Sequence, residues 1–106
     1  MKLINPSHCL VARTLDIVGD KWTLHILRDA LLFKSKPFAQ FEQSPDNIPT
    51  SLLADRLKRL VENGFLTKVP YQDKPARYHY LTTDKGKAML PIIRAMKKFG
   101  ETQLKS

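Results

Sequence analysis

Polar side chains recur at helical spacing in the segment PTSLLADRLKRLVENG, where they could hydrogen-bond to base edges or neutralise phosphates. Thr50 and Ser51 stand near its start, Asp55 and Lys58 follow one and two turns later, and Arg59 adjoins Lys58. The alternative for Thr50 or Ser51 is to cap a helix. For Lys58 and Arg59 the alternative is a solvated basic face.

A second group of polar side chains could bind phosphates outside that segment. Lys74 and Arg77 flank the tip of a predicted hairpin, where positive charge suits a phosphate or a narrow minor groove. The alternative is charge that protects an exposed hairpin edge. Lys36 and Gln40 lie near the start of a short predicted helix, whose N-terminus could meet a phosphate.

Cys9 offers thiol chemistry, and as the only cysteine it excludes an internal disulfide. Near a helix N-terminus, beside His8 and Arg13, it is a candidate redox or electrophile sensor acting by alkylation, a mixed disulfide or a Cys9–Cys9 link between protomers. The alternative is a small buried apolar residue. A thiol enzyme would lack a positioned base. The scattered histidines, His8, His25 and His79, predict no metal site, and we expect no cofactor and no enzyme.

The size and charge of the chain limit the kinds of partner that it could bind. The chain has 106 residues, enough for one domain with a single core, and 42% of them are hydrophobic. Its 18 Lys and Arg against 10 Asp and Glu give a net charge of +8, which favours a polyanion such as nucleic acid. No apolar run approaches a membrane span or a signal peptide. With the lone cysteine, this predicts a reducing cytoplasm.

These side chains must be positioned by a small set of elements. Apolar periodicity, capping residues and β-branched runs predict a mostly α fold with a small antiparallel β-hairpin. A short helix, a turn and a long helix form a helix-turn-helix, and the hairpin that follows would be a wing. The expected helices cover residues 7–18, 21–33, 38–43, 49–64 and 83–104, the last kinked at Pro91, with a connector at 35–37 and strands at 65–71 and 77–81.

Each predicted helix has an apolar side that serves the core. In the long helix this side holds Leu53, Leu57, Leu60 and Val61. Arg56 lies nearer that buried edge, so we expect it to pair with an acid such as Glu42 or Glu62 and rank it below Lys58 as a DNA contact. The apolar residues of the first two helices are read as core, not as a cofactor site.

The ordered set of motifs resembles the HxlR-type winged helix-turn-helix transcriptional regulators over roughly residues 8–100. Two departures keep apolar character: Leu10 where the family often has proline, and Phe99 where it often has tryptophan. The matching segments are CLVA (9–12), GDKWTLHILR (19–28), FAQF (38–41), IPTSLLADRLKRL (48–60), ENG (62–64), RYHYLT (77–82) and Gly86.

The resemblance implies a bacterial or archaeal, nucleoid-associated homodimer. In this homodimer the protomers are joined through the dimerisation helices 8–18 and 83–104. Helix 49–64, the second helix of the helix-turn-helix (38–64), lies in a major groove, and the wing (65–81) contacts flanking DNA. The apolar richness of the last helix supports this mildly, the alternative being an intramolecular core. The expected interface residues are Leu10, Val11, Met89, Ile92, Ile93, Met96 and Phe99.

The sequence therefore predicts a sequence-specific, double-stranded DNA-binding regulator, a repressor that occupies a pseudo-palindromic operator as a homodimer. It is a candidate for control by a small-molecule or oxidant effector, with Cys9 as the responsive group. The alternative is a winged-helix protein-interaction module that binds no DNA.

Overall fold

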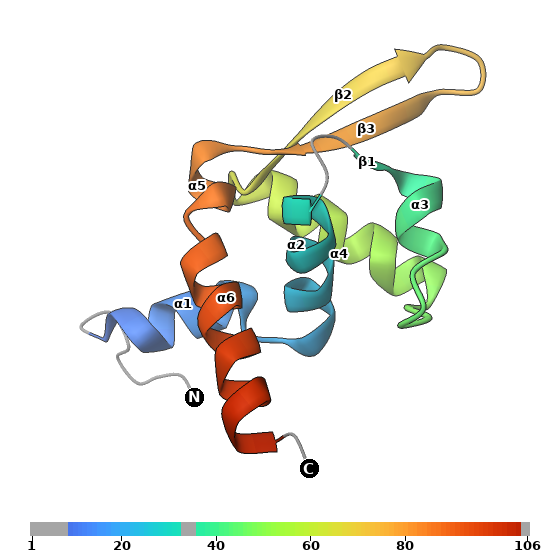
Figure 1. Ribbon diagram of the computed structural model, residues 1–106. Helices are drawn as coiled ribbons and strands as arrows, with labels where there is room; N and C mark the ends of the chain where they lie inside the picture. The colour runs from blue at the N-terminus through green and yellow to red at the C-terminus, as the bar shows by residue number, and fades with distance from the viewer. Residues whose placement is uncertain (1–8, 33–35, 105–106) are drawn as a thin grey trace.

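The computed structural model describes residues 9–32 and 36–104 of the chain. Helices form the body of the molecule, and a long hairpin projects from it (Figure 1). This confirms the expected fold class; the expectations for Ser7, His8 and residues 33–35 lie outside the described residues. In chain order the elements are α1 (Leu10–Val18), α2 (Lys21–Leu32), β1 (Lys36–Pro37), α3 (Phe38–Glu42), α4 (Thr50–Glu62), β2 (Leu66–Gln72), β3 (Arg77–Thr82), α5 (Asp84–Lys87), α6 (Leu90–Phe99) and the π-helical turn η2 (Gly100–Leu104).

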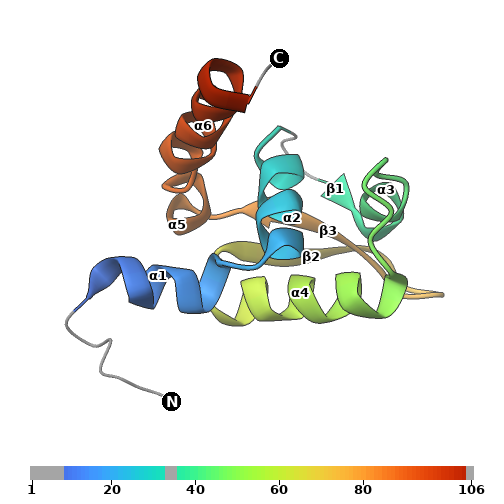
Figure 2. The ribbon, with the colours of Figure 1, turned by 90° about the horizontal axis from the view of Figure 1, so that it is seen from below.

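The first helix begins later than the sequence predicted. Cys9 is its N-cap, and the Cys9 Sγ accepts a hydrogen bond from the Ala12 backbone N–H at 3.4 Å. Helix α1 extends away from the other helices (Figure 2), and Val18 at its C-terminal end is buried in the core. Asp20 caps α2 as expected, because its carboxylate accepts from the Thr23 N–H at 3.3 Å.

The helix-turn-helix consists of α3, a turn and α4. Phe41 of α3 is buried, and Asn47 in the turn adopts a φ of 58°, a left-handed conformation that asparagine tolerates. The apolar face of α4 packs into the core through Leu53, Leu57 and Leu60, as predicted, and Val61 is partly buried against them. Pro49 precedes α4 as its N-cap without a side-chain hydrogen bond, so the alternative in which Thr50 or Ser51 caps the helix is wrong.

The wing belongs to a sheet that, within the described residues, has the strand order β1-β3-β2. Strands β2 and β3 form the expected antiparallel hairpin, with Lys68 paired to Tyr80. Strand β1 is a correction, because residues 35–37 were expected to be a connector. Its backbone pairs with β3 through Lys36 opposite Tyr80 and Pro37 opposite His79, which ties the start of α3 to the hairpin.

The C-terminal helix is divided where one kinked helix was predicted. Thr83 caps α5, accepting from the Gly86 N–H at 3.0 Å, and the helix ends before Met89. Pro91 then lies in the first turn of α6, where its missing N–H has no intrahelical partner to lose. Proline therefore marks a helix start here, not a kink within a helix.

One apolar core joins these elements. It includes Leu27 of α2 and Leu66 of β2, and it also takes in Met89, which is 4% exposed. Met89 was expected at a dimer interface, and its burial within the monomer corrects that expectation. The core residues are Val18, Ile26, Leu27, Ala30, Phe41, Ile48, Leu53, Leu57, Leu60, Phe65, Leu66, Tyr80 and Met89.

Candidate nucleic-acid interface

The face of α4 opposite the core presents most of the expected contact residues to solvent. Ser51, Asp55 and Lys58 are exposed, and they follow one another at roughly one-turn intervals. Arg59 is half-buried at the edge of this face. The spacing gives α4 a continuous polar stripe, which we call the α4 face.

Thr50 begins the α4 face but is engaged by a neighbouring helix. Its hydroxyl donates a hydrogen bond to Glu42 Oε2 of α3 at 3.2 Å. The hydroxyl oxygen keeps acceptor capacity, so Thr50 can still accept from a base edge. The same bond joins the end of α3 to the start of α4 across the turn.

Arg56 is held by two carboxylates that the sequence did not indicate. Its Nε donates to Asp20 Oδ2 at 3.1 Å, and its Nη1 donates to Asp55. Glu42 and Glu62, the partners expected for Arg56, are therefore not those of this ion pair. Arg56 links the N-terminal cap of α2 to the middle of α4 and also engages Asp55 on the α4 face.

The charges of Asp20 and Arg56 stabilise each other. Burial raises the pKa of Asp20, but hydrogen bonds from Thr23 and Arg56 outweigh it and leave the pKa below its ordinary value. The hydrogen bond to Asp20 raises the pKa of Arg56. Arg56 therefore ties α4 to the N-terminal cap of α2, and this structural role supports the lower rank of Arg56 as a DNA contact.

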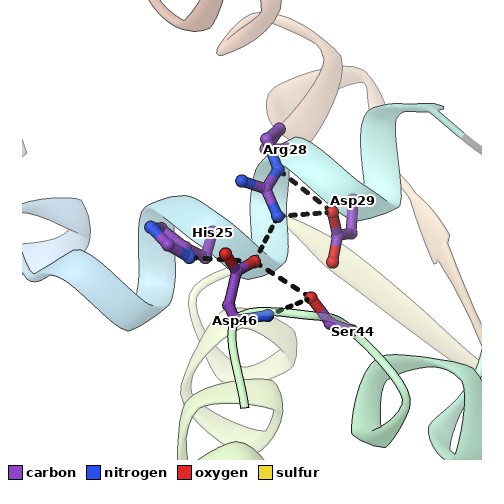
Figure 3. Close-up of polar contacts among 5 residues, drawn as sticks. All are labelled: His25, Arg28, Asp29, Ser44 and Asp46. Carbon is purple, nitrogen blue, oxygen red and sulfur yellow. Dashed lines mark hydrogen bonds and ion pairs between the residues drawn. The ribbon is translucent and has the colours of Figure 1, made fainter. Parts of the chain in front are cut away.

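A polar cluster on α2 holds the turn that precedes α4 (Figure 3). Arg28 Nη2 donates to Asp29 Oδ1 at 2.9 Å and also to Asp46 in the turn. Ser44 Oγ donates to Asp46 Oδ2 at 2.9 Å, and His25 Nδ1 lies 3.1 Å from the same oxygen.

These contacts lower the pKa of Asp46 to about 2, chiefly through the hydrogen bond from Arg28. The sequence indicated only a turn at residues 44–47 and missed the cluster. The polar type of Asp46 was a signal, but nothing in the local sequence identifies a partner on α2.

The wing carries cations in two places. Lys74 and Arg77 are exposed at the hairpin tip, as expected. Lys68 was not among the predicted contacts; it is exposed on β2, and its Nζ lies 4.2 Å from the centroid of the Tyr78 ring. The hairpin projects well beyond α4 (Figure 1), so its tip lies apart from the α4 face.

The remaining expected contacts lie near α3. Gln40 is exposed on that helix. Lys36 lies in β1, and its backbone pairs with Tyr80. The sheet thus brings the position of Lys36 beside the middle of the wing, away from the hairpin tip.

Cys9 and the terminal helices lie apart from the α4 face. Cys9 is exposed, so its alternative interpretation as a small buried residue is wrong. Leu10 and Val11 on α1 are 71% and 69% exposed, and Phe99 on α6 is 59% exposed. Ile92 and Met96 are also exposed, whereas Ile93 is half-buried.

The described residues contain neither a metal-binding cluster nor a membrane-spanning helix. Among the described residues, no three His, Cys, Asp or Glu side chains gather into a group that could hold a metal ion. No helix within the described ranges has both the length and the apolar character needed to cross a membrane.

A helix-turn-helix with an exposed polar face on its second helix, followed by a β-hairpin, defines a winged helix-turn-helix protein. A profile of the HxlR-like helix-turn-helix family matches residues 17–106. The chain therefore belongs to the HxlR-like helix-turn-helix family.

Individual relatives agree with this assignment. The chain is 37% identical over 94 residues to an uncharacterised HTH-type transcriptional regulator of Mycobacterium tuberculosis, covering 89% of this chain and 58% of the relative. It thus spans less than two thirds of that protein. The structure of a putative MarR-family transcriptional regulator from Porphyromonas gingivalis superimposes with a TM-score of 0.83 at 29% identity, covering 96% of this chain and 99% of that one.

A third similarity is to the redox regulator HypR in its reduced form. The TM-score is 0.78 at 28% identity, with 87% of this chain and 90% of HypR covered. All three similar proteins are named as regulators, and none is named as an enzyme.

Proposed function

We propose that this protein is a transcriptional regulator that binds double-stranded DNA in a sequence-specific manner and represses by occupying its operator. The observation that carries the proposal is the polar α4 face beside a cation-bearing wing, in a chain of net charge +8. Helix α4 would enter the major groove, where Thr50, Ser51, Asp55, Lys58 and Arg59 meet base edges and phosphates. Lys74 and Arg77 of the wing, together with Lys36 and Gln40, would contact the flanking backbone.

A homodimer completes this proposal, because it would present two α4 helices to a pseudo-palindromic operator. Exposed apolar side chains on α1 and α6 support it. A groove of about 700 Å³ between α2 and α6 adds further apolar surface, lined by Leu31, Leu32 and Leu90 among others. We assign the interface to Leu10, Val11, Ile92, Ile93, Met96 and Phe99, without Met89.

The test is a fluorescence-polarisation titration of labelled genomic duplex fragments at several salt concentrations. We expect affinity to fall steeply with salt, and Lys58→Ala or Arg77→Ala to flatten the log–log salt slope by about one unit. Unchanged slopes would remove those residues from the interface. Salt-insensitive or absent binding would instead favour a winged-helix protein-interaction module.

A second proposal concerns control of DNA binding through Cys9. Two observations favour it: Cys9 is exposed at the N-cap of α1, and a similar protein, HypR, is named as a redox regulator. The thiol could be alkylated, form a mixed disulfide, or link to Cys9 of a second protomer. In the last case two thiols lose two protons and two electrons, and a peroxide that accepts them is reduced to water.

The experiment compares DNA affinity before and after treatment with hydrogen peroxide, for the wild type and for Cys9→Ser. We expect the oxidant to change the affinity of the wild type several-fold, and the serine variant to keep its affinity. An equal response of both proteins would rule out Cys9 as the sensor.

A further inference from the structure

A groove separates α4 from the hairpin sheet, and lysines stand on both of its walls. It has a volume of about 310 Å³, and its floor is formed by Phe38, Val61 and Tyr80. Lys58 lines it from α4 and Lys68 lines it from β2. The other lining residues are Ala54 and Glu62 of α4.

The strand register explains why Lys68 faces α4. Lys68 is paired directly with Tyr80, and side chains of directly paired residues project from the same face of a sheet. Tyr80 is 9% exposed and packs edge-on against Phe41, so this face looks toward the helices. Lys68 lies on the same face but remains exposed, with its ammonium over the Tyr78 ring.

The charges and the floor of the groove indicate its occupant. Two lysines line a space whose lining contains one carboxylate, that of Glu62. An apolar floor between cations suits a chain of alternating sugars and phosphates, because sugars can pack on the floor while phosphates meet the lysines. The groove adjoins the α4 face, since Lys58 belongs to both.

We propose that this groove binds the DNA backbone, so that one strand passes between α4 and the wing with Lys58 and Lys68 bound to its phosphates from opposite sides. This inference rests on the proposed function and adds a residue, Lys68, that links its two contact points. It also assigns a role to Glu62, whose carboxylate repels phosphates and limits how closely the backbone approaches.

The experiment measures the salt dependence of duplex binding for Lys68→Gln, Lys68→Arg and the wild type. We expect the Gln variant to flatten the log–log slope by about 0.9 and the Arg variant to keep it, because one phosphate contact is lost only in the first. Glu62→Gln should tighten binding. Circular dichroism and thermal melting confirm that each variant is folded.

The matched control is Lys87→Gln, an exposed lysine on α5, outside the groove. If this variant flattens the slope as much as Lys68→Gln, the effect is one of net charge and the proposal fails. If the wild type binds duplex with a steep salt slope that Lys68→Gln leaves unchanged, the groove assignment fails while the proposed function stands. A wild type that binds no duplex overturns both.

A last arm separates the DNA backbone from free phosphate as the occupant. Sodium phosphate and sodium chloride, compared at matched ionic strength, should weaken duplex binding equally. Selective displacement by phosphate that disappears in Lys68→Gln would assign the groove to the free anion and overturn the proposal.

Discussion

Asp46 shows how a single carboxylate can position a helix, α4, to which it does not belong. It receives hydrogen bonds from Arg28 on α2 and from Ser44 in its own turn, and it lies just ahead of α4. Arg56 also fixes the position of α4, because from within that helix it donates a hydrogen bond to Asp20 at the start of α2. Helix α2 is therefore the scaffold against which both the turn and the long helix are fixed.

Asp46→Asn should make the protein less stable at pH 7 by about 1–2 kcal/mol, because a half-buried charged hydrogen bond is weakened. The pKa of Asp46 is about 2 in the folded protein against an ordinary 3.8, so its stabilisation is present above about pH 4 and is lost as the pH falls toward 2. Urea unfolding at pH 7, 4 and 2.5 should show the difference shrinking with acid.

Asp73→Asn, at the exposed hairpin tip, is the control for that comparison. It should leave the free energy of unfolding nearly unchanged at each pH. A stability difference for Asp46→Asn that persists undiminished at pH 2.5 would contradict the assigned origin of the effect.

At the level of elements, α5 is pressed against the start of the wing. A Cβ added at Gly86 would lie 2.2 Å from the Phe65 carbonyl oxygen. That oxygen cannot withdraw freely, because it accepts a hydrogen bond from the Thr83 N–H at 3.1 Å. Glycine at this position therefore sets the distance between α5 and β2.

Gly86→Ala should destabilise the fold by about 1–3 kcal/mol through overpacking. Gly100→Ala provides the matched change, since a Cβ there meets nothing within 4 Å and the backbone is helical. That variant should be up to about 1 kcal/mol more stable than wild type, because glycine is a poor helix former. Thermal unfolding of both variants measures these two differences in stability. If Gly86→Ala is as stable as the wild type, α5 can shift away from β2.

Local patterns were enough to predict most elements. Helical periodicity located α4 because its apolar face is complete, and the runs of aromatic and β-branched residues located the hairpin, each to within two residues. The sequence could not reveal β1, since two residues carry no pattern and their strand character comes only from pairing with β3. Pro91 was read as a kink because the sequence does not show that the preceding turn ends α5.

At the scale of the whole molecule, the polar α4 face could be predicted but its supports could not. Exposed positions follow from helical spacing, whereas the partners of Arg56 and Asp46 lie far away in sequence and meet only in the fold. Lys68 was missed for the same reason. Its place beside Lys58 depends on how the sheet packs against α4.

Phe99→Asp should convert a dimer to a monomer without unfolding it, because it places a carboxylate within the proposed apolar interface. Phe99 is 59% exposed in the monomer, so the monomer itself should tolerate the change. Sedimentation or light scattering measures the mass. Val69→Asp, at an exposed apolar position on the hairpin, should keep the mass of the wild type.

Arg28 and His25 each contact two different parts of the molecule. Both line the groove between α2 and α6, and both contact Asp46 in the turn before α4. A second protomer or a small molecule bound in this groove would touch the side chains that hold the turn before α4. The groove between α2 and α6 and the turn before α4 therefore share two side chains, so the two places are only one residue apart although they serve different surfaces of the molecule.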